Sequence, residues 1–301
     1  MLKNEEIISD ALNNIDVINF LKKNNLSSEF VSKNSFKIDD FLNGWVKCSS
    51  GPLSECKQQT KGYKKILSYE NNIMYVSTTF CEHYLFENHN YKIIKNYIYA
   101  DFDLKSDLKT MGEYAKEMKG EPLENSRFNL INDFKKIINI KKGKGFFIYG
   151  KMGVGKTFLA KLIANNYAYK GLKTAFITVA KLIRTIKNDF NTTDQNGTKL
   201  LNLLTKAEVL VLDDIGADKP SIWSRDELLF SLLNYRMENK LLTFFTSNLT
   251  LSQLQKKYAF KTTDSDEQTL EKIANERFIE RVKALSAPYK IDGVNWRLSE
   301  N

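Results

Sequence analysis

The spacing of apolar residues changes twice along the first half of the chain. Across residues 4–24 apolar side chains recur every three or four positions, which predicts one amphipathic helix that the Asn24-Asn25 pair ends. Its apolar positions are Ile7, Ile8, Leu12, Ile15, Ile18 and Leu21. From residue 41 to residue 99 the pattern becomes short aromatic-rich runs, such as 74–76 and 97–99, which predict the strands of a small module.

Residues 103–126 are mostly charged or polar, contain Gly112, Gly120 and Pro122, and show no sustained apolar period. Such a stretch is typical of a linker. We therefore expect an N-terminal domain over residues 1–104, a linker over 105–126 and a second domain over 127–301.

In the second domain, short apolar runs alternate with helical patterns. The predicted elements are 145–149, 156–169, 174–179, 181–190, 209–212, 226–238 and 243–246. Strands that alternate with helices indicate the α/β class, with a parallel sheet flanked by helices on both faces.

Composition narrows the class of protein. The chain has 301 residues, 42% of them hydrophobic and 27% charged, which suits one or two globular domains. No apolar run approaches the roughly 18 residues that span a bilayer. The N-terminus lacks a basic start followed by an apolar stretch, so we expect no secretory signal and a cytoplasmic location.

The net charge of +9 is unevenly distributed. Residues 1–104 carry 12 Lys and no Arg against 13 acidic residues, whereas residues 105–301 carry 33 basic residues against 23 acidic ones. This excess favours a polyanionic partner such as nucleic acid or nucleotide. A solvated lysine-rich surface explains it equally well.

All three cysteines and both histidines fall within one short stretch: Cys48, Cys56, Cys81, His83 and His89. Crowding of this kind in a chain without a secretory signal favours a zinc site over disulfides. The alternative is that the cysteines are small buried apolar side chains.

The sequence Gly150-Lys-Met-Gly153-Val-Gly155-Lys156-Thr157 lies between a predicted strand and a predicted helix. Glycines at this spacing allow backbone N–H groups to surround phosphates, and the helix start adds a positive dipole. Lys156 would reach the β and γ phosphates, and Thr157 would bind magnesium. This motif predicts ATP binding.

Two further strand ends complete the expected site. Asp213 and Asp214 follow the apolar run 209–212, where Asp213 would hold magnesium and Asp214 would polarise the attacking water. Asn248 follows the run 243–246 and would contact the γ phosphate or that water, although an asparagine at a strand end also serves simply as a turn former.

The chain has only seven arginines, and Arg277, Arg281 and Arg297 lie in its last 25 residues. A guanidinium suits phosphate better than an ammonium does, so the nucleotide of a neighbouring subunit is one target for Arg277 and Arg281. The alternative is that these two arginines form surface ion pairs with Glu276 and Glu280.

Several strings of the second domain recur in a known family: 150–157, Leu212-Asp213-Asp214-Ile-Gly-Ala217, Trp223-Ser-Arg-Asp-Glu227, Tyr235-Arg-Met237 and Thr243-Phe-Phe-Thr-Ser-Asn248. In their order and their amino acids these strings resemble the AAA+ module of the DnaI and DnaC family of bacterial helicase loaders. The resemblance spans about residues 127–297, and the DnaI type is the nearer match.

The resemblance implies an ATPase of the primosome that binds the hexameric replicative helicase, holds it with single-stranded DNA and couples ATP turnover to its loading during DNA replication. It implies that Asn248 is sensor 1, that Arg281 is an arginine finger acting between self-associated AAA+ domains, and that Arg297 matches a second sensor. The N-terminal domain would dock the helicase, and single-stranded DNA would lie on a basic face that includes the helix from Lys181 to Asn188.

DnaI-like proteins carry zinc in this N-terminal domain, usually through an early pair of cysteines two residues apart. Here Gly51 stands three residues after Cys48, so the usual pair is missing. Cys48, Cys56, Cys81 and His83 remain as a Cys3His set, with His89 as the alternative fourth ligand.

Other P-loop proteins remain as alternatives. A transposition-helper ATPase shares the AAA+ core but acts with a transposase. A small-molecule kinase uses the same loop to transfer phosphate to a metabolite. A scaffold that binds ATP and hardly hydrolyses it is a third alternative, because Asp214 stands where many AAA+ proteins have Glu.

Overall fold

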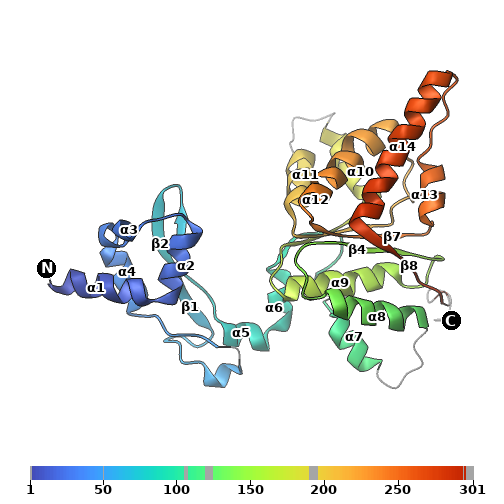
Figure 1. Cartoon of the computed structure of the whole chain (residues 1–301). Helices are drawn as coiled ribbons and strands as arrows, with labels where there is room; N and C mark the ends of the chain where they lie inside the picture. The colour runs from blue at the N-terminus through green and yellow to red at the C-terminus, as the bar shows by residue number, and fades with distance from the viewer. Residues whose placement is uncertain are drawn as a thin grey trace. The chain divides into compact units, whose positions relative to one another are not determined.

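The computed structural model describes residues 2–49, 51–104, 108–118, 125–189, 196–293 and 295 (Figure 1). The chain divides into two compact units, Met1–Tyr91 and Lys92–Asn301. The division lies earlier than residue 104, where the sequence places the end of the first domain.

Short helices and one hairpin make up the first unit. Its elements are α1 (Leu2–Asn13), α2 (Ile15–Lys23), α3 (Ser28–Lys33), α4 (Ser35–Leu42), a 3-10 turn (Leu53–Glu55), β1 (Tyr63–Glu70), β2 (Ile73–Phe80) and α5 (Glu82–Glu87), and α6 (His89–Ile94) runs across the division. Val17, Phe20, Phe41 and Met74 belong to one buried cluster. This unit therefore has a core of its own.

The prediction of a single helix over residues 4–24 is wrong, because the helix is interrupted at Asn14. The Asn14 side chain accepts hydrogen bonds from the backbone N–H groups of Asp16 and Val17 and so caps the start of α2. The break changes which face is buried: Val17 is buried, whereas 53% of Ile15 is exposed.

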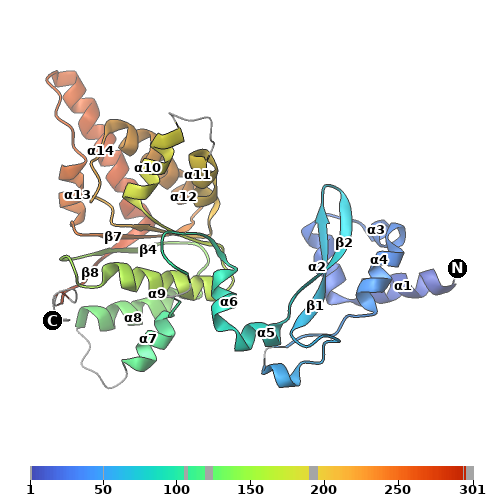
Figure 2. The same ribbon diagram turned by 180° about the vertical axis from the view of Figure 1, so that it is seen from behind.

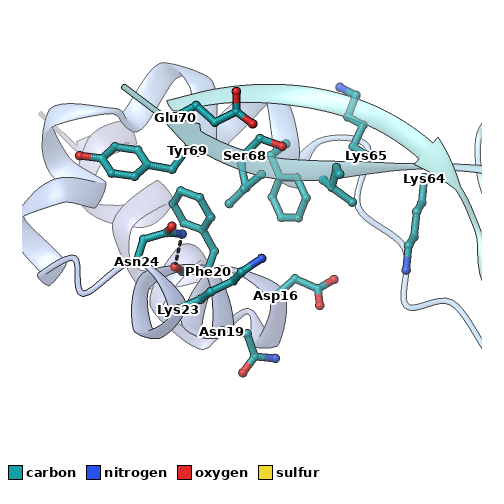
Figure 3. Close-up of a pocket in the computed structure, with 13 residues that line it drawn as sticks. Asp16, Asn19, Phe20, Lys23, Asn24, Lys64, Lys65, Ser68, Tyr69 and Glu70 are labelled. Carbon is teal, nitrogen blue, oxygen red and sulfur yellow. Dashed lines mark hydrogen bonds between the residues drawn. The ribbon is translucent and has the colours of Figure 1, made fainter. Parts of the chain in front are cut away.

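Strands β1 and β2 pair antiparallel around a two-residue turn in which Asn71 and Asn72 have φ of 51° and 62°. Helix α2 packs against β1. A hollow of about 380 Å³ lies between them (Figure 3), where Lys23, Lys64 and Glu70 are among the lining side chains. The lining includes no cysteine or histidine, so this hollow offers no thiol or imidazole for catalysis.

The second unit contains a six-stranded sheet in the order β3-β5-β6-β7-β4-β8, and every pairing in it is parallel. Its strands are β3 (Tyr97–Ala100), β4 (Gly145–Tyr149), β5 (Thr174–Thr178), β6 (Val209–Asp213), β7 (Leu242–Ser247) and β8 (Ser286–Lys290). The parallel sheet expected from the alternation of strands and helices is confirmed.

Helices cover both faces of this sheet (Figures 1 and 2). On one face lie α7 (Met111–Glu117), α8 (Asn125–Ile137) and α9 (Lys156–Tyr169); on the other lie α10 (Val179–Asp189), α11 (Asn196–Lys206), a π-helical turn (Ser224–Leu229), α12 (Phe230–Glu238), α13 (Leu251–Lys257) and α14 (Ser265–Leu285). Val209 and Val211 of β6 belong to the buried cluster on the side of α7, α8 and α9, and Leu210 and Leu212 belong to the cluster on the opposite side. Alternate residues of one strand thus feed two cores.

Two elements of the second unit lie where the sequence predicted other parts of the chain. One lies in the predicted end of the first domain, and the other lies in the predicted linker. β3 pairs with β5, although the run 97–99 was assigned to the first domain. α7 lies inside the predicted linker, begins with a capping box between Thr110 and Glu113, and buries Met111 and Tyr114. Both depend on contacts with residues distant in sequence, which local periodicity does not reveal.

No helix among the described residues is long and apolar enough to cross a membrane.

Arg225 and Arg236 are fully buried. Arg225 bonds the carboxylates of Asp226 and Glu271. Among the described residues Arg236 has only neutral partners: its Nη1 donates to the carbonyl of Leu204 at 2.9 Å, its Nη2 to that of Leu242 at 2.7 Å and its Nε to the hydroxyl of Thr243 at 2.9 Å. Burial lowers the pKa of Arg236 to about 9, which leaves it protonated at neutral pH. Arg236 therefore ties the end of α11 to β7.

We expect Arg236→Lys to lower the free energy of unfolding by about 2–4 kcal/mol, because an ammonium cannot reach carbonyls on several sides and leaves some of them buried without a donor. Urea denaturation measures the change. Arg184→Lys is the matched control, since Arg184 is exposed and its replacement should cost under about 0.5 kcal/mol. Equal effects of the two substitutions would contradict this role of Arg236.

Candidate nucleotide-binding site

The loop between β4 and α9 has the backbone that its glycines predict. Gly153 and Gly155 have φ of 80° and 84°, a left-handed conformation that other residues rarely adopt. A Cβ at position 153 would lie 1.8 Å from Oδ1 of Asn295, so a side chain there would force Asn295 to move. Gly155 directly precedes the first turn of α9, whose free N–H groups favour an anion.

Lys156 lies at the start of α9, and only 7% of it is exposed. Its ammonium donates to the carbonyls of Gly150 at 3.1 Å and Lys151 at 2.7 Å, and to Oδ1 of Asn248 at 2.8 Å. The charge is therefore held within the loop, next to the end of β7.

Asp213 ends β6 and is 5% exposed. The hydroxyl of Thr157 donates to its two carboxylate oxygens, at 3.0 and 3.2 Å, and the hydroxyl of Thr246 donates to Oδ1 at 2.5 Å. Burial raises the pKa of Asp213, and the two hydroxyls and nearby Lys161 oppose that rise in part. A hydroxyl and a carboxylate in contact form the pair of oxygen ligands that magnesium prefers.

Asp214 follows in a left-handed conformation, with φ of 56°. Its backbone N–H donates to Oγ1 of Thr246 at 2.8 Å, and its Oδ1 accepts from Nδ2 of Asn248 at 3.0 Å. These two bonds hold a conformation that is uncommon outside glycine, and they turn the second carboxylate toward Asn248.

The structure thus brings together Lys156, Thr157, Asp213, Asp214 and Asn248, which come from three segments of the chain. Arg281 is placed elsewhere: it contacts Phe230 and Asn234 of α12. Arg297 lies outside the described residues.

Sequence reasoning missed two residues that support this group. Thr246 contacts both Asp213 and Asp214, yet it counted only as part of a strand. Arg127 is buried and donates from Nη2 to the carbonyl of Val154 inside the loop at 2.7 Å. The scarcity of arginine in this chain is the signal that would have singled out Arg127.

Three of the four predicted zinc ligands, Cys48, Cys81 and His83, lie together in the first unit, and the fourth, Cys56, is next to Cys81. Sγ of Cys48 is 3.3 Å from Nδ1 of His83, and Sγ of Cys56 is 3.7 Å from Sγ of Cys81. The ligand atoms of Cys48, Cys81 and His83 lie within 4.8 Å of one another. Two sulfurs on one tetrahedral zinc ion stand about 3.8 Å apart, since each Zn–S bond is about 2.3 Å, so these spacings suit such an ion. The side chain of His89 lies outside the described residues.

The basic helix considered for single-stranded DNA is α10. Lys181 is already paired with Asp101 at 2.5 Å, and the Lys187 ammonium lies 5.7 Å from the centre of the Trp223 ring. Arg184 is exposed. Of the three basic residues, Arg184 has the fewest ties to the rest of the protein.

Two family models match the chain. The model described as "IstB-like ATP binding protein" matches residues 124–266, and the model described as "Primosomal protein DnaI N-terminus" matches residues 2–77. The first covers the phosphate loop and both acidic strand ends, and the second covers most of the first unit.

Among curated relatives, the replicative helicase loader DnaI of Bacillus subtilis is 29% identical over 97% of this chain and 93% of its own length. The replicative helicase loader DnaC of Escherichia coli is 29% identical over 37% of this chain and 45% of its own length. A crystal structure of DnaI superposes with a TM-score of 0.55 at 26% identity and covers 68% of this chain and 98% of that one. The chain is therefore similar to DnaI along nearly its whole length, the resemblance seen in its motifs is confirmed, and its second unit has the AAA+ P-loop fold.

We expect Asp213→Asn to stabilise the protein at pH 7 while it removes magnesium-dependent ATP turnover. Because burial raises the pKa of Asp213, the folded state binds the proton more tightly, and this residue's contribution to stability is lost as the pH rises through that pKa. Asparagine removes the buried charge. Thermal unfolding from about pH 4 to 8 should show a higher melting temperature at pH 7 and a weaker pH dependence for Asp213→Asn, together with a roughly 100-fold loss of turnover. A lower melting temperature at pH 7 would contradict this account of Asp213.

Proposed function

We propose that this DnaI-like chain is an ATP-dependent loader of the replicative DNA helicase. The observation that carries the proposal is its similarity to the helicase loader DnaI over 97% of its length, which includes the first unit as well as the P-loop unit. A shared AAA+ fold alone would support only nucleotide binding, because one fold serves many functions.

In this proposal ATP binds at the loop 150–157. Backbone N–H groups of the loop and of the first turn of α9 hold the phosphates, and Lys156 exchanges its bonds to Gly150, Lys151 and Asn248 for phosphate oxygens. Thr157 and Asp213 would hold magnesium, which would supply positive charge for the phosphates. The contact between these two side chains makes the site fit that ion.

Hydrolysis would use the residues at the ends of β6 and β7. Asp214 and Asn248 orient a water molecule toward the γ phosphorus, and Asp214 accepts its proton. As the new bond to phosphorus forms, the bond from the γ phosphorus to the bridging oxygen breaks and ADP leaves. Arg281 would act on the nucleotide of a neighbouring subunit.

The first unit would dock the hexameric helicase, and the second would couple nucleotide turnover to deposition of the helicase on single-stranded DNA. A transposition-helper ATPase is the second candidate, because the model that matches the P-loop region is the IstB-like one. The match of residues 2–77 to the DnaI N-terminus favours the loader.

We also propose that zinc joins the parts of the first unit. Cys48 and Cys56 precede the hairpin, one on each side of the 3-10 turn, and Cys81 and His83 follow β2. One ion bound by all four would hold both ends of the hairpin together, which small domains often need.

Co-purification with the replicative helicase of the source organism tests the loader proposal. We expect the full-length chain to bind, and deletion of residues 1–91 to weaken binding at least about 100-fold, equivalent to roughly 3 kcal/mol. Lys156→Ala should weaken ATP binding about 10- to 100-fold, since a charged hydrogen bond is worth about 1.5–3 kcal/mol, yet leave the first unit able to bind the helicase.

Absence of binding with and without ATP, together with binding to a transposase, would favour the transposition-helper candidate. Binding that survives the deletion would reject the docking role of the first unit.

Metal analysis of the purified full-length chain tests the zinc proposal. We expect one zinc per chain, lost in His83→Ala and retained in His89→Ala, because the Nδ1 atom of His83 lies against Cys48. Loss of zinc in His89→Ala alone would assign the fourth ligand to His89. A wild-type protein purified without zinc would reject the site.

A further inference from the structure

Arg127 connects two helices to the phosphate loop. It lies near the start of α8, and only 5% of it is exposed. Its Nη2 donates to the carbonyl of Val154 at 2.7 Å, and its Nη1 donates to the hydroxyl of Tyr114 in α7 at 3.4 Å. The shorter bond is charge-assisted and so belongs to the stronger class of hydrogen bonds. Arg127 therefore holds one backbone carbonyl of the loop firmly.

Val154 is held by its side chain as well. It is 1% exposed and belongs to the same buried cluster as Tyr114 and Leu159. With its side chain packed and its carbonyl bonded, Val154 cannot rotate freely. The plane of the peptide bond that joins it to Gly155 is thus fixed from two directions.

This peptide bond is trans, so its C=O and N–H groups point in opposite directions. Because the carbonyl faces Arg127, the N–H of Gly155 faces away from the guanidinium. Gly155 caps α9, and its own carbonyl accepts from the N–H of Leu159 at 3.0 Å. No hydrogen bond from another described residue reaches the Gly155 N–H, so it adds to the free N–H groups of the first turn of α9.

Gly155 also makes this peptide bond easy to flip. Its φ is 84°, and glycine adopts positive and negative φ about equally well. A flip would turn the carbonyl, in place of the N–H, toward the bound phosphates and repel them. The guanidinium packs directly against this glycine, since a Cβ at position 155 would lie 3.4 Å from Nη2 of Arg127. The freedom that the loop requires at Gly155 is restrained by the bond to Val154.

We infer that Arg127 is a positioning residue of the phosphate site, which holds the carbonyl of Val154 and so keeps the N–H of Gly155 turned toward the phosphates of bound ATP. The inference rests on the proposed binding of ATP at the loop 150–157. It adds a residue from outside that loop, which orders the N–H group before the phosphates arrive and so lowers the entropy lost on binding. The alternative is a purely structural role, like that of Arg236 between α11 and β7.

Ligands that represent the two halves of ATP distinguish these roles. Competition against a fluorescent ATP analogue, with the full-length chain, measures the affinities for ATP, inorganic pyrophosphate and adenosine. We expect Arg127→Met to bind ATP and pyrophosphate roughly 10-fold more weakly, equivalent to about 1.4 kcal/mol, and to bind adenosine unchanged. Arg127→Lys should recover most of the loss, because an ammonium can still donate to one carbonyl.

Asn165→Ala is the matched control for lost stability. Asn165 is 1% exposed, its Nδ2 donates to the carbonyl of Lys109 at 2.8 Å, and its Oδ1 accepts from the hydroxyl of Tyr97 at 2.7 Å. It belongs to α9 but makes neither bond to the phosphate loop. Its replacement should lower the melting temperature and leave the pyrophosphate affinity unchanged.

Nuclear magnetic resonance observes the positioned group directly. Val154-Gly155 is the one Val-Gly pair in the sequence, so isotope labels on the carbonyl carbon of valine and the nitrogen of glycine select the Gly155 amide alone. We expect saturating pyrophosphate to shift this signal strongly in the wild type and in Arg127→Lys, and much less in Arg127→Met.

Equal weakening of adenosine and pyrophosphate binding by Arg127→Met, or a Gly155 shift as large as in the wild type, would overturn the positioning role and leave the structural one. If Arg127→Met does not fold, Arg127→Gln provides the same comparison with a polar group kept at this position. Lys156→Ala separates this inference from the proposed function. Unchanged pyrophosphate binding in Lys156→Ala would reject the nucleotide site itself, whereas a loss there without a loss in Arg127→Met would reject the role of Arg127 alone.

Discussion

The parallel alignment of β4, β6 and β7 is the constraint on which the nucleotide site depends. Parallel neighbours end at the same edge of a sheet, so the loop after β4, the acids after β6 and Asn248 after β7 meet there. Thr246 lies within the ladder itself and bonds both Asp213 and Asp214. A shift of one residue in β7 would send the Thr246 side chain to the other face of the sheet, and the site would come apart.

Polar groups inside the second unit are anchored by more than one bond. Arg225 and Arg236 reach several partners each, and Asp213 accepts from two threonines. Such anchoring explains how the protein tolerates a buried carboxylate and a left-handed Asp214 side by side. Two of the strings that carry the family resemblance surround Arg225 and Arg236, so these strings preserve the frame of the fold as much as its chemistry.

The two units use different means to hold themselves together. The second has two large buried clusters, one on each side of a six-stranded sheet, and a small third one around Ile93. The first has one smaller cluster, a two-stranded hairpin and a group of three cysteines and a histidine at the ends of that hairpin. A small core leaves more of its stability to local devices, such as the Asn14 cap and a metal-binding group.

Local sequence determined the α/β class, the bounds of β4 and α9 and the identity of the loop between them, because periodicity, glycine spacing and helix starts are properties of neighbouring residues. It also named Asp213, Asp214 and Asn248, since each directly follows or ends an apolar run. Only the tertiary structure decided that β3 joins the main sheet, that α7 belongs to its core, that Thr246 and Arg127 support the site, and that Arg281 lies against Phe230 of α12. Each of these rests on a contact between residues far apart in the chain, and such contacts leave no periodic trace in a single sequence.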